Sequence, residues 1–210
     1  MRNPFATSYI RPGAIPFFFP EGWSLKRLLA QLAAQGHWGQ IVGPHGSGKS
    51  TLLAQLASAI EQSGCSVARY TLRQNDRRPP AWPPPSGTSV VVIDGYEQLA
   101  WMWRWRVKAW CRRHASGLVV TAHRDVGLPT LWTTTSDLDT LRRIVDHLLA
   151  AARTTPQDAP ERPIPWFSKD DLASALAAAQ GNLREALFRL YDVYQQRSLA
   201  AAPIPDILER

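Results

Sequence analysis

The stretch Gly-Pro-His-Gly-Ser-Gly-Lys-Ser-Thr occupies residues 43–51 and decides how the rest of the chain is interpreted. It fits the pattern G-x-x-x-x-G-K-[ST], whose glycines allow a tight loop with backbone N–H groups close to phosphate oxygens. In such a loop Lys49 reaches the β- and γ-phosphates of a nucleotide, and the Ser50 hydroxyl ligates Mg²⁺. The candidate nucleotide-binding residues are Gly43, Pro44, His45, Gly46, Ser47, Gly48, Lys49, Ser50 and Thr51.

The context of the loop separates this interpretation from an ordinary glycine turn. A short apolar strand is predicted at 39–42, and Leu52, Leu53 and Leu56 recur downstream at helical spacing. The helix would present its positive N-terminal end to the same phosphates. Strand, loop and helix in this order are the context that a phosphate-binding loop requires.

A second signal, an acidic residue, follows at the end of a later strand. Residues 89–94 read Ser-Val-Val-Val-Ile-Asp, a β-branched run typical of a buried parallel strand. Asp94 would then lie at the carboxyl end of the sheet beside the phosphate loop, where a carboxylate holds the hydration shell of Mg²⁺. The sequence thus predicts ATP and Mg²⁺ as cofactors, with Ser50 and Asp94 at the metal.

The remaining pattern predicts an α/β fold. Further strands are expected at 66–72, 117–124 and 128–133, and helices at 24–36, 46–63, 96–114, 137–149, 168–179 and 183–197. Residues 153–165 form a proline-rich connector. We expect a nucleotide-binding core over 1–135 and a helical lid over 136–202.

Composition narrows the class of protein. The two cysteines among 210 residues form neither a disulfide framework nor a metal pattern, which suits a reducing cytosol. No apolar run is long enough to span a membrane, so a cytoplasmic protein without a membrane partner is expected. The formal net charge of +7 is compatible with a nucleic acid or another acidic partner, and equally with a coding bias toward Arg, Ala and Pro.

The predicted helix at 96–114 has two different faces. Its core side carries, at helical spacing, Tyr96, Leu99, Trp103, Val107 and Trp110. Trp101 and Trp105 lie on the other side, among Arg104, Lys108 and Arg112. We expect these two tryptophans to pack against the N-terminal segment or the loop at 73–87. The alternative is that the face at 101–112 binds nucleic acid, by stacking of bases on the indoles, or an acidic protein.

The order of these elements resembles that of the AAA+ ATPases, and within them the branch of origin-recognition and bacterial secretion ATPases. The resemblance rests on residues 43–51, 94–99, 121–124 and 181–187. It implies a three-layer αβα sandwich, a parallel five-stranded sheet in the order 5-1-4-3-2 and a small C-terminal helical lid. The segments 3–5 and 17–19 are also similar to the part of such ATPases that lies near the adenine.

The resemblance also implies roles for single residues. His123 matches the polar residue at the tip of the fourth strand that senses the γ-phosphate or positions water, and Arg184 matches the lid arginine that reaches the γ-phosphate. Gly95, however, stands where the family has a water-polarising glutamate. Glu97 is the nearest carboxylate, and only Arg124 is placed to serve as an arginine finger.

These observations favour an ATP-binding nucleotide switch with weak Mg²⁺-dependent hydrolysis, carried by Lys49, Asp94, Glu97, His123 and Arg184. A substitution Gly95→Glu is then expected to raise turnover if the strand end tolerates a side chain. One alternative is a P-loop kinase that transfers the γ-phosphate to a small molecule. Another is a nucleic-acid or protein adaptor that binds ATP only for stability.

Overall fold

The computed structural model describes residues 3–10, 13–154 and 166–200 as two compact units. One unit spans Pro12–Thr135 and contains the sheet; the other combines Met1–Arg11 with Ser136–Arg210. The sequence-based division places the first eleven residues with the core instead. Most of the connector expected at 153–165 lies outside the described residues.

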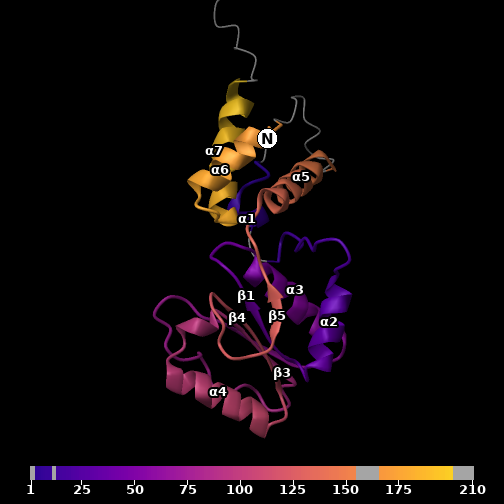
Figure 1. Ribbon diagram of the computed structural model, residues 1–210, viewed down its shortest axis with the longest axis vertical. Coiled ribbons are helices and arrows are strands. Elements are labelled where there is room, and N and C mark those ends of the chain that lie inside the picture. The colour runs from indigo at the N-terminus through magenta and orange to yellow at the C-terminus, as the bar shows by residue number, and fades with distance from the viewer. Residues whose placement is uncertain (1–2, 11–12, 155–165, 201–210) are drawn as a thin grey trace, which may run out of the picture. The chain divides into compact units, whose positions relative to one another are not determined.

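The first unit is built on a five-stranded parallel sheet (Figure 1). Its strands are β1 (Trp38–Val42), β2 (Val67–Thr71), β3 (Val90–Asp94), β4 (Gly117–Ala122) and β5 (Thr130–Thr133). Their spatial order is β2-β3-β4-β1-β5, and every neighbouring pair is parallel. The predicted order 5-1-4-3-2 is therefore confirmed. It places the carboxyl ends of β1, β3 and β4 side by side.

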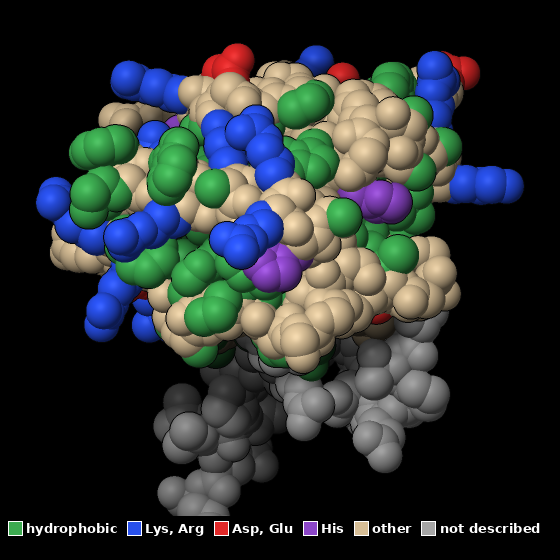
Figure 2. Space-filling model, turned by 90° about the horizontal axis from the view of Figure 1, so that it is seen from below, with side chains coloured by type: hydrophobic (Ala, Val, Ile, Leu, Met, Phe, Trp, Pro, Cys, Tyr) green, Lys and Arg blue, Asp and Glu red, His purple; other side chains and the backbone are tan. Residues whose placement is uncertain are grey.

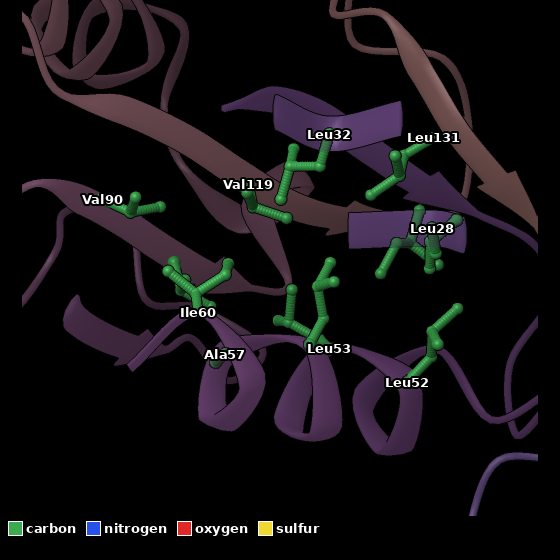
Figure 3. Packing of buried hydrophobic residues seen from close by; sticks show 12 residues of the cluster. Leu28, Leu32, Leu52, Leu53, Ala57, Ile60, Val90, Val119 and Leu131 are labelled. Atoms are coloured by element: carbon green, nitrogen blue, oxygen red, sulfur yellow. The ribbon is translucent and has the colours of Figure 1, made fainter. Parts of the chain in front are cut away.

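Helices cover both faces of this sheet, because successive residues of a buried strand point to opposite sides. Val90 and Val92 of β3 belong to the core cluster shared with α2 (Leu25–Ala34) and α3 (Lys49–Gln62), which Figure 3 shows from close by. Val91 and Ile93 belong to the cluster on the other face, shared with α4 (Trp101–Arg113). The predicted three-layer αβα sandwich is confirmed.

The helix predicted over 96–114 is interrupted. A short 3₁₀ helix, η1, covers Tyr96–Gln98, and α4 begins only at Trp101, after extended backbone at Leu99 and Ala100. Arg104 stabilises the break: its Nε donates to the carbonyl of Leu99 at 2.9 Å, and its Nη2 donates to that of Glu97 at 2.5 Å. One side chain thus pairs two carbonyls that a continuous helix would have satisfied itself.

The face of α4 away from the sheet does not pack as expected. Val107 and Cys111 are fully buried against the sheet, but Trp101 and Trp105 are 78% and 68% exposed. The expectation that these tryptophans pack against the N-terminal segment or the loop at 73–87 is therefore wrong. That loop is instead packed through Trp82, whose ring lies 5.5 Å from that of Trp110.

The second unit is helical and consists of α1 (Thr7–Ile10), α5 (Leu138–Thr154), α6 (Lys169–Ala178) and α7 (Leu183–Ala200). Ser168 and Asp171 form a capping box at the start of α6. Phe5 is fully buried here, with its ring 5.4 Å from that of Phe167 and 5.8 Å from that of Tyr194. This aromatic contact explains why the N-terminal segment groups with the C-terminal helices.

Candidate nucleotide-binding site

The loop at 43–48 joins the end of β1 to the start of α3, and Gly43 and Gly48 show why its backbone needs glycine. Gly48 is the N-cap of α3 and adopts the left-handed conformation, with φ of +90°. At Gly43 an added Cβ would lie 2.6 Å from the carbonyl oxygen of Thr134. The loop is therefore pressed against the segment that follows β5, and a side chain at Gly43 would displace it.

Hydrogen bonds hold the loop in this position. The hydroxyls of Ser47 and Thr134 are 2.6 Å apart, and Ser47 also donates to the carbonyl of Pro44 at 2.8 Å. The backbone N–H of Thr134 donates to the carbonyl of Val42 at 2.8 Å. Thr134 was missed by sequence reasoning, since only the parallel pairing of β1 with β5 brings it to the loop.

Lys49 is buried within the loop that precedes it. Its Nζ donates to the carbonyls of Gly43 at 2.8 Å and Pro44 at 2.6 Å, and lies 3.2 Å from Nδ1 of His123. Burial lowers the pKa of Lys49, while the carboxylates of Glu97 and Asp94 oppose that shift. A desolvated ammonium whose nearest partners are neutral carbonyls has unused capacity to bind an anion.

Ser50 and Asp94, the two residues expected at a metal ion, are hydrogen-bonded to each other. The Ser50 hydroxyl donates to Oδ1 of Asp94 at 3.0 Å, and the buried Thr121 of β4 donates to the same oxygen at 2.5 Å. Thr121 also accepts from the backbone N–H of Gly95 at 2.8 Å. Thr121 thus fixes the orientation of the Asp94 carboxylate. In the sequence analysis this threonine appeared only as part of the segment 121–124 and was given no role.

These residues fit an ion that is shared with a nucleotide. A hydroxyl and a carboxylate are the oxygen ligands that Mg²⁺ takes in such sites, and the remaining positions are filled by water and phosphate. In the described part of the chain, no cluster of three or more His, Cys, Asp or Glu side chains suits a metal ion.

Gly95 cannot simply be replaced by the glutamate that the resemblance leads one to expect. Its φ is +79°, and an added Cβ would lie 2.8 Å from the carbonyl oxygen of Leu72. Any side chain would be strained by both the backbone conformation and this contact. The expectation that Gly95→Glu raises turnover is conditional on a tolerant strand end, and the structure does not meet that condition.

Glu97 lies two residues beyond Gly95 and is directed to the tip of β4. Its Oε1 is 3.1 Å from Nε2 of His123, while its Oε2 is buried and has no hydrogen-bond partner among the described residues. If Nε2 of His123 carries the proton, Nδ1 is free to accept from Lys49. Lys49, His123 and Glu97 then form one connected chain of polar groups.

His45 extends this chain from within the loop. Its ring lies against that of His123, with the centroids 3.6 Å apart and the ring planes tilted by 39°. Burial is the largest cause of a lowered pKa of His45, followed by the charges of His123 and Lys49, and the carboxylate of Glu97 opposes them. This contact was not anticipated, because the pattern G-x-x-x-x-G-K-[ST] leaves position 45 unspecified.

Three further predicted residues are Thr51, Arg124 and Arg184. Thr51 is half-buried in the first turn of α3, and Arg124 is exposed after β4. Arg184 is exposed at the second position of α7, within the helical unit, so its role toward a nucleotide stays a prediction.

An aromatic cluster adjoins the phosphate loop. A Cβ added at Gly48 would lie 3.5 Å from the ring of Phe17, whose backbone N–H donates to Gln55 of α3. The ring of Phe17 packs edge to face with those of Phe19 and Trp132. The segment 17–19, expected near an adenine, therefore does lie beside the loop.

Comparisons with known proteins agree with this geometry. The family model described as AAA domain matches residues 19–161, more than half of the chain. No curated protein sequence matches significantly. A DNA replication initiation factor has a similar structure at a TM-score of 0.56 and 13% identity, with 88% of this chain and 64% of that one covered.

AMPPCP-bound DnaA from Aquifex aeolicus is similar at a TM-score of 0.54 and 13% identity, with 83% of this chain and 61% of that one covered. This chain thus spans less than two thirds of either protein, and at this identity the likeness concerns the fold. The fold and the family model lead to one conclusion: the chain belongs to the AAA domain family, the AAA+ P-loop ATPases.

Proposed function

We propose that this protein is a Mg²⁺-dependent ATP-binding switch that hydrolyses ATP slowly. The observation that carries the proposal is the convergence of Lys49, Ser50 and Asp94 at one end of the sheet, joined by hydrogen bonds between loop, helix and strand. The name of the AMPPCP-bound neighbour, AMPPCP being an analogue of ATP, supports the choice of nucleotide. The lack of a long apolar helix among the described residues and the unpaired cysteines agree with a place in the cytoplasm.

Binding of the phosphates falls to the loop and to Lys49. The backbone N–H groups at the start of α3 attract an anion, and the buried ammonium of Lys49 would exchange its carbonyl partners for phosphate oxygens. Ser50 and Asp94 would hold Mg²⁺, which neutralises charge on the phosphates when bound. Phe17, beside Gly48, is available to contact the rest of the nucleotide.

Activation of water falls to Glu97. Its buried Oε2 has no partner among the described residues and can accept a proton, while His123 fixes the other oxygen. Because Gly95 excludes a carboxylate at the family position, Glu97 would act from two residues further along the chain. A displaced base is consistent with slow turnover and with a long-lived ATP-bound state.

Steady-state turnover of the full chain with Mg²⁺-ATP tests this assignment. Glu97→Gln should reduce the basal rate by about 10²–10⁴-fold, the usual value of a general base, while ATP affinity is retained. Glu61→Gln is the matched control, because Glu61 pairs with Arg69 on the surface of the same unit. A Glu97→Gln rate within twofold of wild type would refute the role of Glu97, and rapid wild-type turnover would refute the slow switch.

A further inference from the structure

The outward face of α4 carries a surface that the nucleotide site does not use. Trp101 and Trp105 are one helical turn apart, and both indoles are largely exposed. Trp105 follows Trp101 by four positions, which corresponds to about 6 Å along the helix axis on one side. Large exposed aromatics on an otherwise well-packed helix mark an interaction site rather than a core.

The helix that carries the two indoles is rich in cations. The α4 sequence contains Arg104, Arg106, Lys108, Arg112 and Arg113, and it contains no acidic residue. Lys108 and Arg112 follow Trp101 and Trp105 along the same side of the helix, at spacings of seven and eleven residues from Trp101. Figure 2, seen from the side on which α4 lies in Figure 1, shows Lys and Arg side chains interspersed with hydrophobic ones and acidic groups near the edges.

Cations of this surface have partners within the fold, but these partners do not neutralise their charge. Lys108 donates to the backbone carbonyl of Val126 at 2.9 Å, and Arg112 lies over the ring of Trp38 at 5.6 Å. These partners are uncharged, so neither cation is neutralised by them. Arg113, one residue further, is exposed at the end of the helix. The surface is therefore complementary to a polyanion.

We propose that α4 binds single-stranded nucleic acid through this surface. Each indole would stack on one unpaired base, and the cations beside them would contact the phosphates. The base faces of a duplex are already stacked on one another, so exposed indoles select a single strand. An acidic peptide would satisfy the cations but would leave both indoles without a stacking partner.

The proposal can be tested on the full chain by fluorescence anisotropy. The labelled probes are oligothymidylate and oligouridylate of 20 nucleotides and a matched duplex. At about 50 mM salt, Trp101→Ala/Trp105→Ala should weaken single-strand binding by at least about fivefold for each stacked base. Trp166→Ala is the matched control, because Trp166 is 72% exposed but belongs to the helical unit. Arg112→Ala should flatten the dependence of log affinity on log salt by about 0.7 if it contacts one phosphate.

Three results would overturn the proposal. The wild type would fail to bind single strands at low salt, or would bind strand and duplex equally, or the double variant would bind the single strand no more weakly than Trp166→Ala does. Binding of phosphatidylserine vesicles, but not of oligonucleotides, with loss in the double variant would assign the surface to a membrane instead. Unchanged circular dichroism and ATP affinity of the double variant exclude misfolding. Without nucleotide, Lys49→Ala should bind the oligonucleotides as the wild type does. The test of the α4 surface is therefore independent of the assignment of the phosphate site.

Discussion

At the scale of the residue, Gly95 separates this chain from the pattern it resembles. Alanine there combines a φ of +79° with a Cβ 2.8 Å from the carbonyl oxygen of Leu72. We predict that Gly95→Ala lowers the free energy of unfolding by about 1–3 kcal/mol. Urea denaturation measures this.

Gly64→Ala provides the control for that experiment. Gly64 has a φ of +90°, but nothing lies within 4 Å of an added Cβ. The difference between the two variants therefore isolates the contact with Leu72 from the backbone strain. If both variants lose the same stability, the crowding at Gly95 is not what keeps a side chain out of this position.

The imidazole of His45 reports on the polar chain around Lys49. Its pKa is lowered by burial, His123 and Lys49 and raised by Glu97, so its NMR titration should lie below the ordinary 6.5. His123→Gln should move the pKa of His45 up, and Glu97→Gln should move it down. The same direction for both variants would contradict the arrangement of charges around His45.

The sign of the corresponding effect on stability follows from linkage. Because the folded pKa of His45 is below the unfolded value, the unfolded chain binds more protons between the two. The contribution of this group is therefore fully present above about pH 6.5 and is lost as the pH falls through the folded pKa. His45 is only slightly desolvated and remains exposed to solvent, so screening keeps the effect small.

Sequence reasoning located the phosphate loop and Asp94 but not the threonines that contact them. The spacing of Gly43, Gly48 and Lys49 is local, so the sequence pattern alone identified the loop. The contacts of Ser47 with Thr134 and of Asp94 with Thr121 depend on the strand order and register, because they join residues 87 and 27 positions apart. No local pattern distinguishes these threonines from others.

At the scale of the element, the break between η1 and α4 decides where Glu97 lies. Arg104 pairs the carbonyls of Glu97 and Leu99 across this break. We predict that Arg104→Met lowers the free energy of unfolding by about 1–3 kcal/mol, because polar groups at the break lose their partner. Turnover should fall at least tenfold with ATP affinity kept, as for Glu97→Gln.

Arg106→Met is the matched control for Arg104→Met. Arg106 is exposed on the same helix and lies over the ring of Trp103, with no part in the break. It should leave both stability and turnover close to wild type. Equal losses in the two variants would point to a general effect of charge on α4 and would contradict the positioning of Glu97 by Arg104.

Element boundaries show where periodicity succeeds and where it stops. Leucines at helical spacing and the cap at Ser24 placed α2 correctly. The same periodicity ran through Tyr96 and Leu99 into α4, because both are buried at positions that a continuous helix would also bury. Hydrophobic periodicity predicts which residues are buried, but it does not predict whether the backbone stays helical. It therefore could not predict the extended residues between η1 and α4.

At the scale of the whole molecule, strand order and layers were predicted through the resemblance of the order of elements to that of the AAA+ ATPases. The grouping of Phe5 with Phe167 and Tyr194 was not, because it joins segments more than 160 residues apart. The exposure of Trp101 and Trp105 was likewise misjudged, since sequence favours burial of so large an apolar side chain. Both outcomes depend on the assembled fold rather than on any single element.

Calorimetric titration with Mg²⁺-ATP tests the central claim most directly, namely that the loop at 43–51 binds the nucleotide through Lys49. Wild type should bind, and Lys49→Ala should bind about 10–150-fold more weakly, the loss expected for one hydrogen bond to a charged group. Lys26→Ala, on the exposed side of α2, should bind like wild type. An affinity unchanged by Lys49→Ala, in a variant that keeps its fold, would contradict the claim.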